Sequence, residues 1–222
     1  MTKQYKDLTS YTEVHQGVVA LAADVVTFTV LGESLQVLLI ERGSQPFKGR
    51  WAIPGGFLRK IESLEDTARR ELREETGVGE GFLMTQIGTW SDPKRDPRGR
   101  VVTTVFAALV DSSELKPKAD TDAAKVAWFP MDELPQLAFD HKDILSRALT
   151  WLRRALYDTR VADALLGETF TLSELRGVHE AILGEPIDKR NFRKRVLASG
   201  MVKETKGYRT GAHRPAQLYK FS

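Results

Sequence analysis

Residues 55 to 78 read GGFLRKIESLEDTARRELREETGV, and this stretch decides the fold of the chain. Glu71, Glu74 and Glu75 stand at positions i, i+3 and i+4, so a helix places their three carboxylates on one face. Clustered carboxylates repel one another unless a cation lies among them, and the hard divalent cations Mg²⁺ and Mn²⁺ prefer oxygen ligands. The alternative is a solvated acidic face, stabilised by pairs such as Arg70 with Glu74. The three glutamates are therefore candidate metal ligands.

The helix in this stretch has its own start and stop signals. Ser63 followed by Asp66 is a capping-box pattern, and Gly77 is a natural C-terminal stop. An apolar residue recurs every fourth position, which predicts a stripe that packs against a sheet. The residues of this stripe are Leu64, Ala68 and Leu72.

The fixed spacing extends beyond the glutamates. After Gly56 come five residues, Glu62, seven residues, Arg-Glu-Leu, one residue, Glu-Glu, one residue and Gly-Val. This pattern resembles the Nudix box, the signature of the Nudix hydrolase superfamily, at every defined position. The resemblance implies an α/β Nudix fold, in which a mixed β-sheet is sandwiched by helices. It also implies that Arg70 orients the box glutamates, that Glu62 supports the box, and that the catalytic residues are Arg70, Glu71, Glu74 and Glu75.

Two segments outside the helix are candidates for ligand binding. Gly55 and Gly56 carry no Cβ, so their backbone can approach a ligand closely. The loop SDPKRDPRGR at 91–100 contains Arg95 and Arg98, whose guanidinium groups suit phosphates, and its prolines stiffen it. Composition alone describes a polar hairpin loop equally well. Similar loops in ADP-ribose-binding Nudix proteins lie near the ligand, and the resemblance therefore favours ligand binding by these four residues.

Length and composition bound the class of protein. A chain of 222 residues is sufficient for two domains, and 41% apolar with 28% charged residues is typical of a soluble globular protein. The absence of cysteine excludes disulfides and thiolate chemistry and favours an intracellular protein. The N-terminal sequence MTKQYKDLTS lacks the apolar core of a signal peptide, and no run approaches transmembrane length. We therefore expect a cytoplasmic protein without a membrane partner.

Apolar and β-branched runs predict the remaining elements of the first domain. Strands are expected at 18–30, 35–41, 82–90, 101–110 and 124–130, with a loop rich in Gly and Pro over 41–57. A helix is expected from about Asp140 to Asp158. His141 stands alone at the start of this helix, where a capping or packing role is favoured over a chemical one.

Charge divides the chain into two unequal parts. Residues 170–222 contain eleven Lys and Arg against five Asp and Glu, a local net charge of +6. Residues 1–169 carry 22 basic and 25 acidic residues, a local net charge of −3. A mildly acidic first part and a basic tail indicate two separate tasks, the second of which involves a polyanion.

The tail has the element order of a winged helix-turn-helix. Helices are predicted from Thr171 to Gly184 and from Asp188 to Ser199, followed by strands at 201–207 and 215–221 around a basic tip. On the second helix Phe192 and Val196 share one face and the basic residues point elsewhere, as DNA recognition requires. The alternative is a basic accessory domain that only stabilises a dimer. The candidate DNA-binding residues are Lys189, Arg190, Asn191, Arg193, Lys194, Arg209 and Arg214.

The combination of the two parts resembles one particular family. A Nudix domain followed by FTLSELRGVHEAILGEPIDKRNFRKRVL…RPAQLYKF is similar to the NrtR family of Nudix-related transcriptional regulators of NAD metabolism. The likeness covers nearly the whole chain, including LAFDHKDIL between the domains. It implies a DNA-binding regulator, expected to be a repressor, of NAD biosynthesis or salvage genes. Such a regulator binds ADP-ribose or a related nucleotide in its Nudix domain and a palindromic DNA operator as a homodimer.

The sequence predicts a Nudix domain at 1–145, a linking helical segment at 146–169 and a winged helix-turn-helix at 170–222. Many members of the family have a degraded Nudix box, but here the box is intact. Mg²⁺-dependent hydrolysis of ADP-ribose to AMP and ribose 5-phosphate is therefore an open hypothesis, with Glu114, Asp120 and Asp122 as candidate general bases. Two other functions also stay open: a Mg²⁺-dependent ADP-ribose pyrophosphatase whose tail only dimerises it, and a Nudix-type regulator of sugar catabolism.

Overall fold

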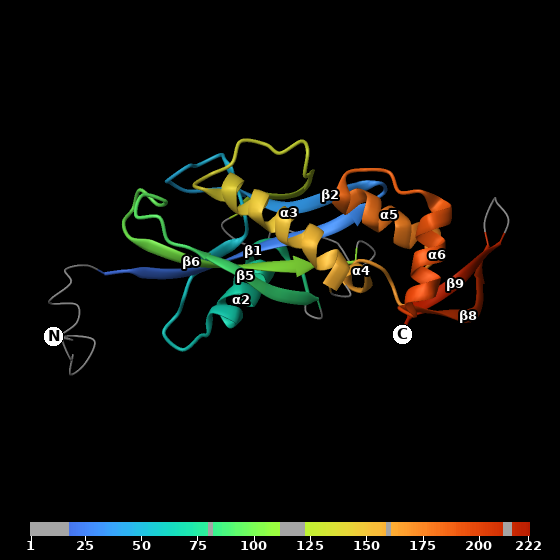
Figure 1. Cartoon of the computed structure of the whole chain (residues 1–222). Helices are drawn as coiled ribbons and strands as arrows, with labels where there is room; N and C mark the ends of the chain where they lie inside the picture. Colours follow the sequence, from blue (N-terminus) through green and yellow to red (C-terminus); the bar gives the residue numbers. More distant parts are fainter. Residues whose placement is uncertain (1–17, 80–81, 112–122, 159–160, 211–214) are drawn as a thin grey trace, which may run out of the picture.

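The protein is described by a computed structural model that covers residues 18–79, 82–111, 123–158, 161–210 and 215–222. Its first part contains one sheet and two helices, and its second part contains three helices and a two-stranded ribbon (Figure 1). The elements of the first part are β1 (Ala20–Leu31), β2 (Ser34–Arg42), β3 (Trp51–Ala52), β4 (Gly55–Phe57), α2 (Leu64–Thr76), β5 (Leu83–Trp90), β6 (Val101–Leu109), β7 (Ala123–Pro130) and α3 (His141–Asp158). Those of the second part are α4 (Val161–Ala164), α5 (Leu172–Leu183), α6 (Lys189–Ser199), β8 (Val202–Arg209) and β9 (Ala216–Phe221).

The sheet of the first part is mixed and covered on both faces. Its strand order is β3-β2-β1-β6-β5, with β4 paired to β1 and β7 paired to β2. β1 and β6 run parallel and the other pairs antiparallel. Alternate residues of β1 face opposite ways: Val25 packs in the core under α2, whereas Val26 and Phe28 pack in the core under α3. The predicted fold, a mixed sheet sandwiched by helices, is confirmed.

The helix α2 starts and ends where the sequence predicts. The Ser63 hydroxyl accepts a hydrogen bond from the backbone N–H of Asp66, whose carboxylate accepts one from the backbone N–H of Ser63. Gly77 ends the helix with φ of 70°, a conformation that costs a residue without Cβ little. Ala68 and Leu72 are fully buried against the sheet. The box glutamates therefore lie on a helix that is fixed at both ends and along one side.

The loop predicted over 41–57 is partly extended. β3 pairs with β2 through Ala52 and Trp51, and β4 pairs with β1 from Gly55 to Phe57. The prediction of a continuous loop was wrong because Gly and Pro content reports local preference, whereas these short strands form by pairing with neighbours already in the sheet. As a result, the glycine pair is held in the sheet directly beside β1.

The helix α3 continues from the sheet into the second part of the molecule. Its first half packs on the sheet through Ile144, Leu145 and Ala148, and its second half joins a core shared with α5 and the ribbon. The predicted boundary after residue 145 falls within this helix, and the domain limits stay a prediction. No helix in the described ranges is long and apolar enough to cross a lipid bilayer.

The second part is closed by pairing between its two ends. Phe170 and Tyr219 exchange two backbone hydrogen bonds, with N···O distances of 3.0 and 2.7 Å, which join the start of α5 to β9. Tyr219, Phe170 and Ile182 are fully buried, and Phe192 of α6 is nearly so. The two helices and the ribbon therefore share one small core, which is continuous with that of α3.

His141 has the packing role favoured by the sequence. Its ring is buried, and its Nδ1 accepts a hydrogen bond of 2.9 Å from the backbone N–H of Ile53. Burial, together with the nearby guanidinium groups of Arg95 and Arg42, lowers the pKa of His141 to about 3. The ring is therefore neutral in the folded protein.

The neutral ring makes stability depend on pH. As the pH falls, the unfolded chain binds a proton at His141 near pH 6.5, whereas in the folded protein the ring stays neutral until about pH 3. The stability that the neutral ring contributes is therefore complete above pH 6.5 and is lost as the pH falls toward 3. In His141→Asn the amide oxygen can take the place of Nδ1. We expect this variant to lose about 1.4 kcal/mol less per pH unit between pH 6 and 4 than the wild type. Urea unfolding across this range measures it, and parallel pH curves for the two proteins contradict it.

Candidate functional site

The face of α2 that carries the box is organised around Arg70. This buried guanidinium donates to Glu62 at 2.7 and 2.9 Å, to Glu71 at 2.5 Å and to Glu74 at 3.2 Å. The hydrogen bond from Arg70 lowers the pKa of Glu62 to about 2. Arg70 thus neutralises and orients carboxylates from both ends of the box, as the resemblance implies for these residues.

Glu75 is held apart from this cluster and meets the glycine pair. Its Oε2 accepts a hydrogen bond of 2.9 Å from the backbone N–H of Gly55. Burial, with the charges of Glu71 and Asp24 adding to it, raises the pKa of Glu75 to about 8. Burial likewise raises the pKa of Asp24 to about 6, with Asp140 and Glu71 adding to the shift. Negative charge is therefore in excess at this point.

The glycine pair leaves space that carboxylates fill. A Cβ on Gly56 would lie 2.2 Å from Oε1 of Glu71, and one on Gly55 would lie 2.2 Å from Oδ1 of Asp24 and 2.6 Å from the carbonyl oxygen of Ala23. Gly55 is therefore required by backbone packing, because a backbone atom cannot move aside as a side chain can. Gly56 brings the backbone within reach of the carboxylate of Glu71.

These residues fit a divalent cation by their chemistry. Within the described residues, no three carboxylate or imidazole groups already converge in the geometry of a metal site. However, all the donors are oxygens, as Mg²⁺ and Mn²⁺ prefer, and burial, with neighbouring carboxylates adding to it, raises the pKa values of Glu75 and Asp24. The residues available to hold such an ion are Glu71, Glu74 and Glu75.

Arg95 is buried rather than presented at the surface. Its guanidinium donates to both oxygens of Asp140, at 2.9 and 2.8 Å, and lies 3.8 Å from Asp24. Only 5% of its side chain is exposed, so it is held by two carboxylates from different elements. Arg95 therefore connects the strand beside Gly55 with the residue that precedes α3.

Arg98 lies on the exposed side of the same loop, next to an arginine that the sequence did not single out. Its guanidinium pairs with Asp96 at 3.0 and 2.7 Å and lies over the ring of Phe57. Arg42, at the end of β2, lies over the ring of Phe139 at 4.8 Å, and Arg98 lies over that ring at 5.7 Å. Burial and the neighbouring charge of Arg98 lower the pKa of Arg42. Two guanidinium groups thus flank one aromatic ring.

Sequence reasoning therefore missed four residues of this site. Arg42 and Asp140 lie far from the box in sequence, and Phe139 carries no motif. Asp24 did carry a signal, because it is a charged residue within the apolar run VVALAADVVTFTV, and a buried charge needs a partner. The candidate general bases Glu114, Asp120 and Asp122 lie outside the described residues.

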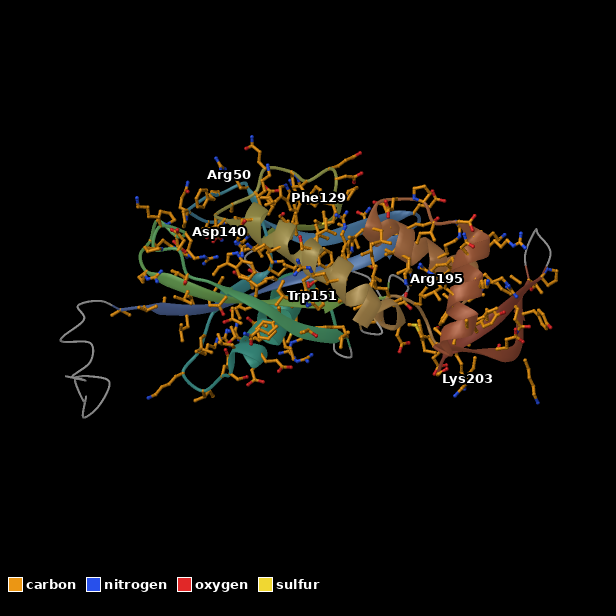
Figure 2. All side chains as sticks on the ribbon, in the orientation of Figure 1. Arg50, Phe129, Asp140, Trp151, Arg195 and Lys203 are labelled. Atoms are coloured by element: carbon orange, nitrogen blue, oxygen red, sulfur yellow. The ribbon has the colours of Figure 1, made fainter. Side chains whose placement is uncertain are left out.

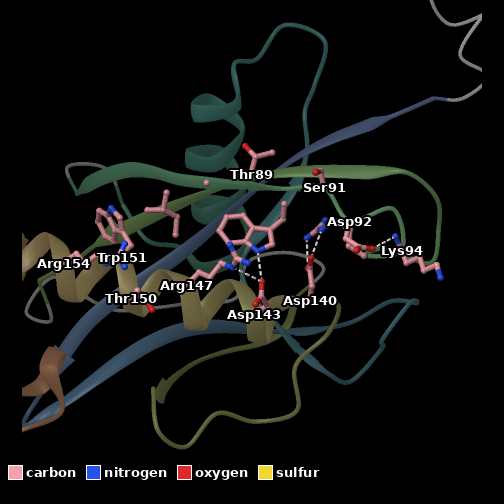
Figure 3. Close-up of a pocket in the computed structure, with 14 residues that line it drawn as sticks. Thr89, Ser91, Asp92, Lys94, Asp140, Asp143, Arg147, Thr150, Trp151 and Arg154 are labelled. Carbon is pink, nitrogen blue, oxygen red and sulfur yellow. Dashed lines mark hydrogen bonds and ion pairs between the residues drawn. The ribbon is translucent and has the colours of Figure 1, made fainter.

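A pocket of about 820 Å³ runs along α3 (Figure 3). Arg95 is one of the residues that line it. Asp140 and Asp143 line it near the start of the helix, and Trp151 and Arg154 line it further along. Thr89 and the segment after β5 form the opposite wall. The ion-paired Arg95 and Asp140 both line this pocket.

The predicted DNA-binding residues of the second helix lie together on α6. The side chain of Asp188 caps this helix, accepting from the N–H of Asn191 at 2.8 Å. Phe192 anchors it, with its ring 5.2 Å from that of His179 on α5. Arg190 and Lys194 stand two residues on either side of Phe192, so both lie on the face opposite the buried ring. All five predicted residues are exposed: Lys189, Arg190, Asn191, Arg193 and Lys194.

The remaining candidates differ in their surroundings. Burial raises the pKa of the Tyr219 hydroxyl on β9, and the guanidinium of Arg193 opposes this shift. Arg209 pairs with Glu174 at 3.3 Å and donates to the carbonyl of Thr169 at 3.2 Å, which ties β8 to the start of α5. Arg214 lies outside the described residues.

Comparisons with known proteins agree with this division. Residues 20–152 match the model of the NUDIX domain, and residues 163–221 match that of the NrtR DNA-binding winged helix domain. A protein of Acinetobacter baylyi, named ADPR responsive transcriptional repressor NtrR, is 36% identical over 206 residues, which cover 91% of this chain and 82% of that protein. This chain belongs to the NrtR family. The predicted Nudix and winged helix folds are thereby confirmed.

The chain is also similar to a regulator whose structures contain DNA or ADP-ribose, and to an enzyme named for ADP-ribose. The crystal structure of Shewanella oneidensis NrtR complexed with a 27mer DNA has 36% identity and a TM-score of 0.77, covering 91% of this chain and 93% of that one. The NUDIX domain of the same protein complexed with ADP ribose has 33% identity and a TM-score of 0.57, covering 65% and 96%. An ADP-ribose pyrophosphatase of Methanocaldococcus jannaschii is 40% identical over 122 residues, covering 55% of this chain and 70% of that protein.

Arg70 provides a direct test of how the box face is stabilised. We expect Arg70→Met to lower the free energy of unfolding by about 2 kcal/mol, since it leaves the partly buried carboxylates of Glu62 and Glu71 without their cation. Arg69→Met is the matched control, because Arg69 pairs with exposed Glu65 at 2.9 Å and such pairs contribute less than about 1 kcal/mol. Urea denaturation of the three proteins measures the difference. Equal losses in the two variants would show that Arg70 has no special role.

Proposed function

We propose that this protein is a DNA-binding transcriptional repressor of NAD biosynthesis or salvage genes, with ADP-ribose or a related nucleotide as its effector. The observation that carries the proposal is the combination in one chain of an arginine-flanked carboxylate site and an exposed basic helix on a winged helix domain. The match of residues 163–221 to an NrtR DNA-binding domain favours this function over a pyrophosphatase with a dimerising tail and over a regulator of sugar catabolism.

The ligand site offers what a sugar-linked pyrophosphate needs. Arg42 and Arg98 would bind phosphate oxygens, because guanidinium groups form strong charge-assisted hydrogen bonds with them. The rings of Phe139 and Phe57 beside them give apolar surface for a sugar or base. The Nudix relatives imply divalent metal dependence in general, and we propose Mg²⁺ or Mn²⁺ held by Glu71, Glu74 and Glu75. Such an ion would neutralise the pyrophosphate.

The DNA side of the proposal requires two copies of the chain. A helix such as α6 reads one half-site in the major groove, with Arg190 and Lys194 directed outward, and a palindromic operator is matched by a two-fold dimer. We propose that the protein acts as a homodimer on such an operator. Lys189, Asn191 and Arg193 would contribute further contacts, whereas Arg209 serves first to hold β8 against α5.

A mobility-shift experiment tests the regulatory function. The protein is titrated into DNA from promoters of NAD-metabolism genes, at fixed salt because phosphate contacts make the affinity strongly salt-dependent. We expect sequence-preferring binding that ADP-ribose weakens. Binding without sequence preference would refute the regulator, and specific binding unaffected by ADP-ribose would refute the effector.

Hydrolysis of the effector is a second candidate function, favoured by the intact box. Arg70 already holds Glu71 and Glu74, and Glu75 receives the N–H of Gly55, so all box side chains are in place. A divalent ion bound there would supply Lewis-acid polarisation of the pyrophosphate. The protein would orient the ligand through Arg42 and Arg98. Cleavage to AMP and ribose 5-phosphate would then end the signal.

A further inference from the structure

The helix α3 contacts both functional sites of the molecule. Figure 2 shows Asp140 at the start of the helix in the Nudix part, Trp151 further along it, and Arg195 in the winged helix part. An α-helix of this kind is stiff, because each backbone hydrogen bond is made within the element itself. Whatever displaces one end of α3 therefore acts on the elements that contact the other end.

The first turn of α3 is held by two contacts from the ligand site. Asp140 receives the guanidinium of Arg95 at 2.8 and 2.9 Å, and the Arg95 guanidinium also lies 3.8 Å from Asp24, whose Oδ1 occupies the space in front of Gly55. His141 accepts the backbone N–H of Ile53, two residues before that glycine. Both contacts end at the residues that would surround a bound pyrophosphate.

The junction before α3 is in a strained backbone conformation. Phe139 has φ of 50°, a left-handed state that bulky residues rarely adopt and that persists only where surrounding contacts impose it. Its ring packs edge-on against Phe47 at 4.8 Å and lies under Arg42. Removal of a contact would favour relaxation of such a junction toward the ordinary backbone conformation of a bulky residue. The strained and relaxed junctions would then be the two states that coupling requires.

The far half of α3 is fixed to the DNA-binding helices. Nε of Arg153 donates at 3.0 Å to the carbonyl of Ile182, in the last turn of α5. Leu152 and Leu156 pack in the same core as Leu175 and Val178 of α5. Next to this contact, a groove of about 1270 Å³ separates the β1–β2 turn from α5, so the two parts are not packed together throughout. Movement of α3 therefore reaches α5, and through it the basic helix α6.

We propose that the ion pair between Arg95 and Asp140 transmits effector occupancy to the winged helix. The inference rests on the proposed function and names its mode of regulation. An anionic effector competes with Asp140 and Asp24 for the guanidinium of Arg95. Loss of this partner releases the start of α3 and lets the strained junction relax. The DNA-binding helices then move. DNA affinity falls by the factor by which the effector binds the relaxed state more tightly than the strained state.

Asp140→Asn tests the proposal without removing a residue that binds the effector. The variant keeps the size of the side chain but removes the charge that holds Arg95. The wild type is expected to lose at least about 10-fold in DNA affinity at saturating ADP-ribose, within the common range of coupling. Asp140→Asn is expected to bind DNA at least about 10-fold more weakly than the wild type even without ADP-ribose, and to lose less than about 3-fold more when ADP-ribose is added. Its ADP-ribose affinity is expected to be at least that of the wild type, which a general structural defect would not allow.

The control is Asp143→Asn, one turn further along the same helix. Asp143 pairs with Arg147 and accepts from Nε1 of Trp90, and it lines the same pocket as Arg95. Its variant should keep the full effector response. A second pair tests the other end of α3: Arg153→Met should reduce the response, whereas Arg154→Met, one residue along, should not. This pair keeps the proposal testable if Asp140→Asn fails to fold.

The outcomes separate the inference from the function on which it rests. If ADP-ribose does not weaken DNA binding by the wild type, the proposed function fails. If the wild type responds and Asp140→Asn responds equally, the function stands and transmission through Arg95 is overturned. Loss of ADP-ribose binding in Asp140→Asn also overturns it, because Asp140 would then belong to the ligand site. If Asp140→Asn does not fold, a full response in Arg153→Met overturns coupling through α3.

Discussion

Replacing both Arg190 and Lys194 by alanine is expected to reduce operator affinity on the order of 1000-fold. Both side chains project from the face of α6 opposite Phe192, and the loss of a base-reading or phosphate-binding side chain costs about 1–3 kcal/mol at each position. The salt dependence of binding should also become shallower, because fewer phosphates are neutralised. Titration of operator DNA at several salt concentrations measures both quantities.

The control for this variant removes the same charge elsewhere. Arg147→Ala plus Arg154→Ala takes two exposed cations from α3, outside the DNA-binding surface. It should lower operator affinity by less than about 5-fold, since screening weakens charges beyond about 10 Å. Comparable losses in the two double variants would contradict a specific role for α6 and leave only a general attraction of a basic protein to DNA.

Glu74→Gln plus Glu75→Gln is expected to lower metal-dependent release of AMP from ADP-ribose by at least about 100-fold. These carboxylates are proposed ligands of the divalent ion, whose Lewis-acid contribution amounts to several kcal/mol of the barrier. Product formation is followed by chromatography with and without Mg²⁺. AMP release that survives the double substitution would refute this assignment of the box.

The loss should not come from unfolding. The pKa of Glu75 is raised to about 8, so the stability this residue contributes when protonated is present below pH 4.5 and lost as the pH rises toward 8. Glutamine resembles the protonated acid at every pH. Glu75→Gln should therefore be at least as stable as the wild type at pH 8 without metal, which thermal unfolding can check.

The sequence predicted the elements that depend on local pattern. The capping box at Ser63, the glycine stop at Gly77 and the exposed basic side chains of α6 all follow from spacing within a few residues. The capping box at Thr171 and the left-handed Gly184 frame α5 in the same way. Such features are readable because their partners lie within one or two helical turns.

What the sequence could not predict depends on residues that are far apart in the chain. Arg95 meets Asp140 across 45 positions, and Ile53 meets His141 across 88. No rule of sequence spacing predicts either pair, because the side chains meet only when the loop and α3 close over the sheet. The sequence therefore offered Arg95 as an open phosphate ligand, and the structure shows the same guanidinium buried between two carboxylates. Its role toward a ligand stays a prediction.

The helix α3 packs on the sheet with its first half and against α5 with its second half, and it therefore sets the orientation of the DNA-binding half. Each residue of an α-helix adds 1.5 Å and turns the chain by about 100°. One residue inserted in the middle of α3 would therefore swing the winged helix to another side of the molecule, although both domains kept their folds. Four inserted residues would restore the direction and add about 6 Å. The length of this helix thus sets both the distance and the rotation between the two parts. These two quantities determine the operator half-site spacings that a pair of these chains can reach.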